Sequence, residues 1–337
     1  MSSAATAIAT DSVCRAVAPS IYQVRLPLPF ALNHVNCYLL DDGDGWTILD
    51  TGLHRPELVE RWEAAWRELD IRRRDIRRVV LTHMHPDHFG LAGWLQQECD
   101  APVWMSPMER DIAHFTWYDR PAAANVGDFG AYLRIAGVSP DVAAVVMKQQ
   151  EYLRGMTRPL PAEIAVLSPG AAIAMAGRTF TAIHAPGHAD GQLLFYSRDD
   201  GLLLCGDHVL QKITPNIGYW VSTHGDPLAN YLASLREVAA LDVALALPGH
   251  HSPLTDWRGR IGELLAHHDQ RLAAMYAAAA PGATALEVSY AVFNYDRFST
   301  HEIRFAVAET LAHLEHLANQ GRLVRDDSGE VRLYRAA

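Results

Sequence analysis

The segment Thr82-His83-Met84-His85-Pro86-Asp87-His88 brings three imidazoles and one carboxylate into a single short loop. It begins at the end of RRVVLT (77–82), whose apolar residues predict a short buried strand. Residues two apart on a tight loop can point to one side and bind one ion, while the next Asp and His can turn toward a second. Imidazole and carboxylate donors together suit zinc, iron or manganese. The segment therefore predicts a metal site at the end of a strand.

Three further candidate ligands follow predicted strands elsewhere in the sequence, and each stands beside a glycine. They are His188 in APGH, Asp207 in CGD and His250 in LPGH. Glycine lets the backbone turn sharply next to the ligand. In layered α/β folds the loops at strand ends converge on one site. We therefore expect these residues to join the 83–88 segment in a single centre.

The composition is that of an ordinary globular protein, apart from its histidines. The chain has 337 residues, 49% of them hydrophobic and 20% charged, which suggests two domains or one large domain with an appendage. The formal net charge of −10 argues against a protein built mainly to hold nucleic acid. Four cysteines without a C-x-x-C pair argue against a cysteine-based zinc site and a disulfide framework. The positions of the 17 histidines therefore decide the chemistry.

The sequence shows no sign of a membrane segment or of export. No apolar run reaches about 18 residues, so no membrane span is expected. The first residues have no basic side chain before Arg15 and no long apolar core, so they do not resemble a secretory signal. We expect a cytoplasmic protein that does not bind membranes.

The order of predicted elements indicates an α/β catalytic domain over residues 1–258. Segments rich in β-branched and aromatic residues between 20 and 52 predict antiparallel strands, after which strands alternate with helices. Residues from about 107 to 161 interrupt this alternation, because they are helix-like and rich in Ala, Met and aromatic residues. We expect this stretch to form a helical insert, or cap.

Residues 259–337 predict a second, smaller domain. A long helix is expected over 260–280, and two capping-box patterns predict the starts of two more helices, at Thr284 with Glu287 and at Ser299 with Glu302. A terminal hairpin follows. Three helices and a hairpin are the order of a winged-helix module, which could also serve to form a homodimer through an apolar helix face.

The ligand pattern resembles that of the metallo-β-lactamase-fold hydrolases, most closely their glyoxalase II-like branch and their branch of lactamase-like endoribonucleases. The resemblance covers roughly residues 20–256, and Leu49-Asp50-Thr51-Gly52 matches a further motif near the start of the family. It implies a four-layer αββα sandwich, here with the helical insert and the winged-helix-like domain. It also implies two divalent metal ions, zinc first, with iron or manganese as alternatives.

The resemblance also assigns a role to each residue of the pattern. It places one ion between three histidines, His83, His85 and His188. It places the second ion between Asp87, His88 and His250. Asp207 would bridge the two ions, and Asp50 would lie behind the ligands and orient them. Asp87 and Asp207 are the residues expected to take part in catalysis.

The implied chemistry is hydrolysis by a hydroxide that bridges the two metal ions. Water between two divalent ions loses a proton near neutral pH and attacks a carbonyl or phosphoryl centre. Aromatic residues of the insert and of the segment after Asp207 predict an apolar pocket, with walls from Trp117, Tyr118, Tyr219 and Trp220. An apolar pocket favours an acyl thioester as substrate. A lactone or another ester is the first alternative and RNA the last, because basic and acidic residues are mixed in the C-terminal domain.

The histidines outside this pattern are not expected to be metal ligands. His184, His208 and His251 adjoin candidate ligands and are expected in loops or behind the ligands. The others are expected on the surface or on helix faces: His114, His224, His267, His268, His301, His313 and His316.

Overall fold

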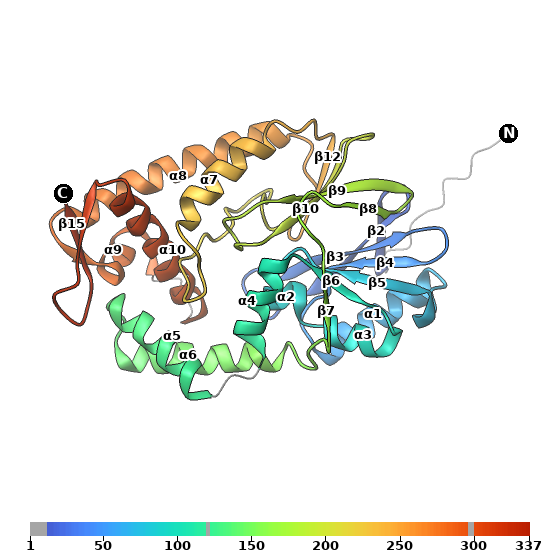
Figure 1. Cartoon of the computed structure of the whole chain (residues 1–337), viewed down its shortest axis with the longest axis horizontal. Helices are drawn as coiled ribbons and strands as arrows, with labels where there is room; N and C mark the ends of the chain where they lie inside the picture. Colours follow the sequence, from blue (N-terminus) through green and yellow to red (C-terminus); the bar gives the residue numbers. More distant parts are fainter. Residues whose placement is uncertain (1–11, 119–121, 296–299) are drawn as a thin grey trace.

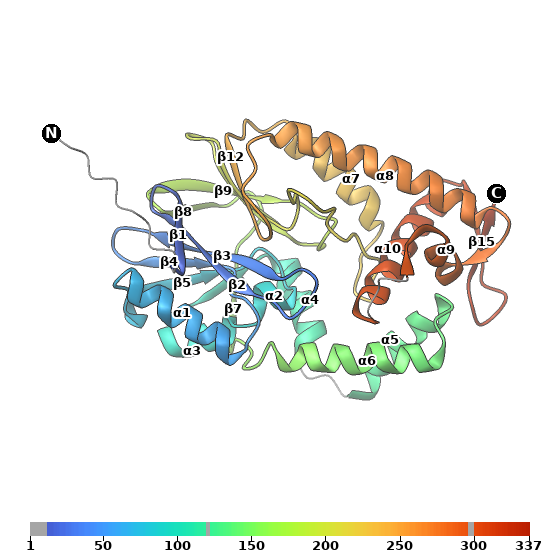
Figure 2. The ribbon, with the colours of Figure 1, turned by 180° about the vertical axis from the view of Figure 1, so that it is seen from behind.

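Two β-sheets lie face to face in the part of the molecule that holds the N-terminal three quarters of the chain (Figure 1). The computed structural model describes residues 12–118, 122–295 and 300–337. Helices cover the outer face of each sheet, and a smaller helical part lies at the C-terminal end. The view from behind shows the same layers with left and right exchanged (Figure 2).

The first sheet has seven strands, which lie side by side in the order of the chain. Its first four strands pair antiparallel and its last four parallel. The strands are β1 (Cys14–Ala18), β2 (Ile21–Pro27), β3 (His34–Asp41), β4 (Trp46–Leu49), β5 (Ile76–Val80), β6 (Val103–Met105) and β7 (Ile164–Val166). The predicted strands between 20 and 52 and the strand before His83 are confirmed, whereas β7 was not predicted.

The second sheet has five strands in the order β12-β11-β10-β9-β8. β11 and β12 pair in parallel, and the other neighbours pair antiparallel. The strands are β8 (Ala172–Met175), β9 (Arg178–His184), β10 (Leu193–Ser197), β11 (Leu202–Gly206) and β12 (Leu245–Pro248). In consequence β9, β11 and β12 run the same way, and their carboxyl ends reach the same edge of the sheet.

Three apolar layers hold the sandwich together. Between the sheets lie buried residues such as Tyr38, Phe180 and Phe195. On the outer face of the seven-stranded sheet, α1 (Pro56–Glu68) and α3 (Ala92–Cys99) bury their apolar sides. On the outer face of the five-stranded sheet, α7 (Pro227–Val238) and α8 (Trp257–Ala279) do the same. The four layers confirm the predicted αββα sandwich.

The predicted helical insert is present between β6 and β7. It consists of α4 (Pro107–Trp117), α5 (Ala122–Ile135) and α6 (Pro140–Gly155). Ser106 and Ser139 cap α4 and α6, because each hydroxyl accepts a hydrogen bond from the backbone N–H three residues later and a proline follows each serine. Two shorter elements, the 3-10 turn at Arg73–Asp75 and α2 (Pro86–Phe89), were not predicted.

The C-terminal part has the predicted order of helices and hairpin. α8 is followed by α9 (Ala285–Val292), α10 (Thr300–Asn319), β14 (Leu323–Asp326) and β15 (Leu333–Ala336), and a short strand, β13 (Ala283–Thr284), adds to the hairpin. Thr284 and Glu287 form the predicted capping box, while Ser299 lies outside the described residues. No helix in the described stretches, including the long α8, is apolar enough over a sufficient length to cross a membrane.

The boundary between residues 258 and 259 stays a prediction. It falls in the first turn of α8. That helix packs on α7 of the sandwich as well as on α9 and α10 of the C-terminal part. Since one helix belongs to both cores, the two parts share an apolar cluster rather than a linker.

Three of the histidines expected on the surface or on helix faces lie on helices of the C-terminal part, but their side chains are buried. His268 and His313 are at most 1% exposed, and His268 Nδ1 lies 3.1 Å from His313 Nε2. Burial lowers the pKa of His313 to about 3 and that of His268 to about 2. His316 is nearly buried too, with its Nδ1 2.9 Å from Asp226. The side chain of His301 is not among those described.

Candidate metal centre

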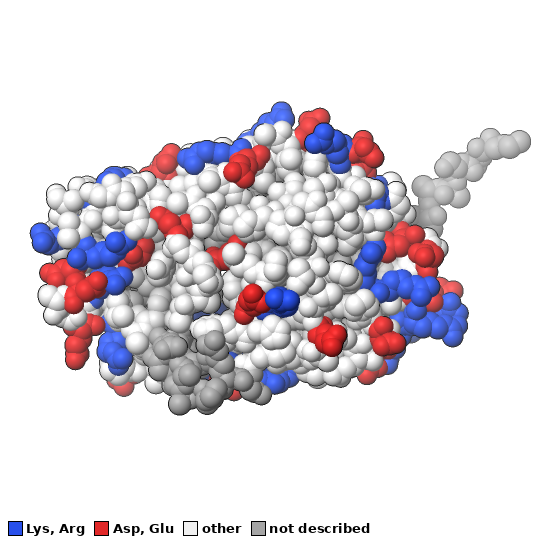
Figure 3. All heavy atoms as spheres, in the orientation of Figure 1, with Lys and Arg blue, Asp and Glu red and all other residues white. Residues whose placement is uncertain are grey.

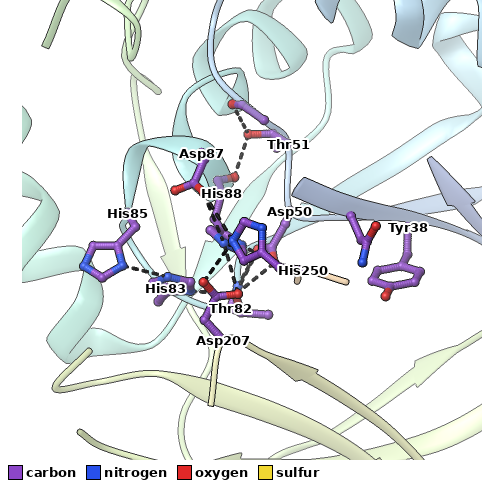
Figure 4. A network of polar contacts seen from close by, with 12 residues as sticks. Tyr38, Asp50, Thr51, Thr82, His83, His85, Asp87, His88, Asp207 and His250 are labelled. Atoms are coloured by element: carbon purple, nitrogen blue, oxygen red, sulfur yellow. Dashed lines mark hydrogen bonds and ion pairs between the residues drawn. The ribbon is translucent and has the colours of Figure 1, made fainter. Parts of the chain in front are cut away.

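The candidate ligands come together where parallel strands of both sheets end. β4 and β5 lead into Asp50 and His83, and β9, β11 and β12 lead into His188, Asp207 and His250. The carboxyl ends of parallel strands share one edge, so the facing sheets bring these loops to a common point. Figure 4 shows His83, Asp207 and His250 turned toward one another at this point.

Three histidine nitrogens form the first group. His83 Nε2 lies 3.0 Å from His85 Nδ1, which lies 2.9 Å from His188 Nε2. The other nitrogen of His188 faces the Asn216 carbonyl at 2.9 Å and must donate to it, so Nε2 carries a lone pair. Burial lowers the pKa of His85 to about 3, with His188 adding to the effect, so a shared proton is disfavoured. Lone pairs that face one another in this way fit a bound cation.

Asp87, His88 and His250 form the second group, and Asp207 lies between the two groups. His250 Nε2 is 3.4 Å from Asp87 Oδ2. The Asp207 carboxylate is 3.1 Å from His250 Nε2, 3.4 Å from His88 Nε2 and 3.6 Å from His188 Nε2. Asp207 is therefore within reach of atoms from both groups, as a bridging carboxylate would be.

The donor atoms fit metal ions better than they fit one another. Three buried atoms of the cluster lie near opposite charges without a well-aligned hydrogen bond to any described residue: Nε2 of His88, Nε2 of His250 and Oδ1 of Asp207. Buried polar atoms without a partner are rare and call for an explanation such as a missing ion. Imidazole nitrogens and carboxylate oxygens are the donors that zinc, iron and manganese take. The residues present therefore fit the divalent ions that the sequence pattern implies.

Gly249 leaves the space that this packing needs. A Cβ at this position would lie 2.2 Å from Asp207 Oδ1 and 2.7 Å from His88 Cε1. Any other residue would push the carboxylate or the imidazole away. The glycine next to His250 is thus required by close approach to the candidate ligands, whereas the sequence suggested only a sharp turn.

Neighbouring charges in the cluster act on the pKa values of its members in the direction opposite to burial. Burial lowers the pKa of His250, but Asp207 and Asp87 outweigh it and raise that pKa to about 10. Burial likewise raises the pKa of Asp207, yet His250 and His88 hold it well below its usual range. A bound cation would replace the imidazolium charges in this balance, since the largest local charge sets the protonation of its neighbours.

Asp50 lies behind the cluster, where the sequence placed it. Its Oδ2 is 2.8 Å from His88 Nδ1, and its Oδ1 accepts a 2.8 Å hydrogen bond from the Thr82 backbone N–H. The residue has φ of 58°, in the left-handed region that Asp and Asn tolerate better than most residues. Because a carboxylate only accepts, the proton of neutral His88 sits on Nδ1 and the lone pair on Nε2 points at Asp207.

A cavity of about 800 Å³ opens onto the cluster. Five candidate ligands form part of its wall: His85, Asp87, His188, Asp207 and His250. The remaining wall is mostly apolar and comes from the loop at Phe30, the insert, the segment 210–222 and α10. In both ribbon views α6 and α10 lie side by side, so the C-terminal part completes the cavity (Figures 1 and 2).

Two of the four aromatic residues predicted for the pocket wall are found there. Trp117 and Trp220 line the cavity. Tyr118 and Tyr219 are not among its lining residues, so these two assignments are corrected. The Tyr118 hydroxyl donates to the Pro161 carbonyl, and Tyr219 packs on the apolar core beneath the five-stranded sheet. Their sequence positions could not show which side of the backbone faces the cavity.

Comparison with known families decides the identity of the fold. The family model described as "Metallo-beta-lactamase superfamily" matches residues 31–250, and that described as "Metallo-beta-lactamase-like, C-terminal domain" matches residues 272–337. The chain belongs to the metallo-beta-lactamase superfamily. Two solved members resemble it over nearly all its length. A metallo-beta-lactamase family protein of Thermus thermophilus, TTHA1429, is 34% identical with a TM-score of 0.84, and covers 96% of this chain and 100% of its own.

A second solved relative is a beta-lactamase domain protein from Burkholderia ambifaria. It is 32% identical with a TM-score of 0.84, over 96% of this chain and 94% of its own. Among curated proteins, the "Probable metallo-hydrolase YqjP" of Bacillus subtilis is 29% identical over 70% of this chain and 72% of its own length. The "Atrochrysone carboxyl ACP thioesterase AgnL7" of Paecilomyces divaricatus is 25% identical over 72% of this chain, which spans 58% of that relative. Membership and these relatives show a metal-dependent hydrolase.

Glu109 of α4 joins two ligand loops of this superfamily member and was not predicted from the sequence. Its buried carboxylate accepts hydrogen bonds from Met84 N–H at 2.8 Å and from Gly191 N–H at 2.7 Å. One loop carries His83 and His85, and the other carries His188. The pattern Ser106-x-x-Glu109 signals a helix start, so the sequence offered a local explanation and no hint of this long-range contact.

Asn216 joins the ligand loop to the C-terminal helix and was also missed. Its carbonyl accepts from His188 Nδ1, while its side-chain amide donates to the Phe305 carbonyl at 3.2 Å and to Glu309 Oε2 at 3.3 Å. Burial raises the pKa of Glu309 to about 7. The position of α10 thus bears directly on a candidate ligand, and no sequence signal marks this link.

Proposed function

We propose that the protein is a dinuclear metal-dependent hydrolase of acyl thioesters. The observation that carries this proposal is the placement of seven donor residues at one end of a largely apolar cavity of about 800 Å³. One ion would be held by three histidines, His83, His85 and His188. The other would be held by Asp87, His88 and His250, with Asp207 shared between both. Zinc is the expected metal, with iron or manganese as alternatives.

The residues of the cluster and of the cavity wall would have different roles in such a reaction. Divalent ions bound here would supply a nucleophilic water at neutral pH and polarise the substrate carbonyl. Asp50 and the Asn216 carbonyl accept from Nδ1 of His88 and of His188, so that the Nε2 atoms of the neutral rings are free to hold an ion. Asp87 is 18% exposed and lines the cavity, so its carboxylate would hold the second ion at the side that a substrate can reach. Trp117 and Phe129 of the wall would keep bulk water from the acyl chain.

The name of one relative and the distribution of charged side chains support a thioester rather than RNA as the substrate. One curated relative is named as an acyl-carrier-protein thioesterase. On the face seen in Figure 3, basic and acidic side chains are interspersed and no extended basic area appears. In the C-terminal hairpin, Arg325 and Arg332 are both paired with Glu315, at 2.7 and 2.8 Å. These arginines are therefore engaged within the protein, whereas a nuclease needs cations that face the phosphates.

A substrate panel tests the proposal. Acyl-CoA thioesters, S-lactoylglutathione, lactones and single-stranded RNA would be offered to one metal-loaded sample, with Asp207→Ala as the inactive control. We expect the acyl-CoA thioesters to be hydrolysed fastest and Asp207→Ala to lose nearly all activity. Faster hydrolysis of lactones would replace the thioester by the ester alternative, and wild-type rates in Asp207→Ala would refute the role of the cluster.

A further inference from the structure

Arg304 of α10 is a buried cation in the cavity wall. Its residue is 9% exposed and lines the cavity. Nη1 donates to Gln150 Oε1 of α6 at 2.7 Å, and Nε has no hydrogen-bond partner among the described residues. A buried charge is costly unless an opposite charge or several hydrogen bonds compensate it. One amide oxygen leaves most of the guanidinium's donors unsatisfied.

The surroundings of Arg304 hold the guanidinium in place without neutralising it. The group lies 4.5 Å from the ring centre of Phe305 and 5.6 Å from that of Trp220. Burial lowers the pKa of Arg304 to about 10, so the side chain stays charged at neutral pH. Glu309, which lines the same cavity, faces Arg271 at 3.7 Å and Asn216 instead. Among the described carboxylates, none forms an ion pair with Arg304.

The second arginine of the cavity wall, Arg154, does have hydrogen-bond acceptors for its guanidinium. Arg154 of α6 donates from both Nε and Nη2 to the Thr116 carbonyl, at 3.0 and 2.7 Å. It ties α6 to α4 and so has a structural use. Within the described residues Arg304 has no comparable bond to the backbone, which makes it a cation available to a ligand.

We propose that Arg304 binds an oxyanion, a carboxylate or a phosphate, on the substrate at a distance from the bond that is cleaved. A largely apolar wall that holds a cation without an ion-pair partner among the described residues fits an amphiphilic acyl compound better than a plain fatty-acyl chain. A guanidinium fixed beside two aromatic rings can form two parallel hydrogen bonds to such a group. This inference rests on the proposed thioesterase function, which it narrows to thioesters that carry an acidic group.

Matched substrate pairs test the inference on the metal-loaded protein. One pair compares octanoyl with suberoyl N-acetylcysteamine thioester, which have chains of equal length, so that only the terminal carboxylate differs. The other pair compares octanoyl-pantetheine with octanoyl-phosphopantetheine, which places the anion on the thiol side. We expect wild type to prefer the anionic member of one pair by about tenfold or more in kcat/KM. The pair that shows the preference identifies the source of the anion.

Variants assign that preference to Arg304. Arg304→Met and Arg304→Gln should bring the ratio close to one while the neutral thioester is still hydrolysed, and Arg304→Lys should retain part of the preference. Arg154→Met is the matched control and should keep the preference. Equal rates for both members of both pairs in wild type, or a preference that survives in the neutral Arg304 variants, would overturn the inference while leaving the thioesterase proposal intact.

A binding measurement separates the two proposals if no thioester is hydrolysed. Suberate and sebacate carry one carboxylate more than octanoate, and thermal unfolding of the metal-loaded protein reports their binding. A larger stabilisation by the dicarboxylates in wild type that is lost in Arg304→Met would support the anion site. The same stabilisation in both proteins would overturn it.

Discussion

Replacing Asp50 with Asn should remove metal from the cluster without unfolding the protein. The carboxylate of Asp50 fixes the His88 proton on Nδ1, at 2.8 Å, and leaves Nε2 free. Asn is nearly the same size and tolerates the left-handed backbone of this position. Its carbonyl can still accept from Thr82 N–H, but its NH₂ then faces His88. The imidazole must move its proton to Nε2, the atom that faces Asp207 and the proposed ion.

Two estimates of the free energy of metal binding lost in Asp50→Asn agree. A hydrogen bond to a charged group between His88 and Asp50, which are 0% and 2% exposed, is worth about 1.5–3 kcal/mol. Loss of a partner that orients a metal ligand lowers metal affinity about 10–100-fold, or about 1.4–2.8 kcal/mol. The expected result is therefore a 10–100-fold weaker affinity for the ion held by His88. The free energy of unfolding of the metal-free protein should change less, because the new tautomer restores a hydrogen bond.

Chelator competition followed by metal analysis measures this effect. Asp50→Asn should lose one of two ions at a chelator concentration that leaves wild type loaded. Asp42→Asn is the control, because Asp42 accepts from Thr47 and the Ala176 N–H and does not contact the cluster. Equal metal retention by Asp50→Asn and wild type would refute the assigned tautomer.

Three further predictions concern packing and pH. Gly249→Ala should abolish metal binding because its Cβ would meet Asp207 Oδ1 at 2.2 Å, whereas Gly262→Ala, with open space, should leave metal content unchanged in the same analysis. Glu109→Gln should cost about 1–3 kcal/mol in urea unfolding, because the amide can accept only one of two backbone N–H groups; an unchanged midpoint would contradict this. Burial lowers the pKa of His268 to about 2, so its stabilising contribution is present above the ordinary pKa of 6.5 and is lost as pH falls. Between about pH 7 and pH 5, the free energy of unfolding measured in urea should therefore fall by about 2 kcal/mol less in His268→Leu than in wild type. An equal fall in both proteins would count against a buried neutral imidazole.

The candidate ligands could be predicted because the signals that mark them are local. A buried strand followed by a glycine and a ligand recurs at His188, Asp207 and His250, and each signal lies within a few residues. Helix starts are equally local, as the capping box of Thr284 and Glu287 shows. Parallel strands then bring such loops together without further information.

The residues that support the site depend on contacts between distant segments. Glu109 binds Gly191, which is 82 residues away, and Asn216 binds Glu309, 93 residues away. Each is polar, and nothing nearby distinguishes it from a surface residue. The buried imidazole of His313 has the same cause. α10 is packed by α6, α7, α8, α9 and β14, so its polar face is enclosed as well, and an apolar stripe alone could not reveal this.

The number of metal ions per chain is the most direct test of the dinuclear cluster. Protein purified without chelators would be analysed by metal mass spectrometry alongside Asp207→Ala. We expect about two divalent ions per chain in wild type, as the two groups of donors require, and fewer in the variant. A value near zero in wild type, or the same content in both proteins, would contradict this expectation.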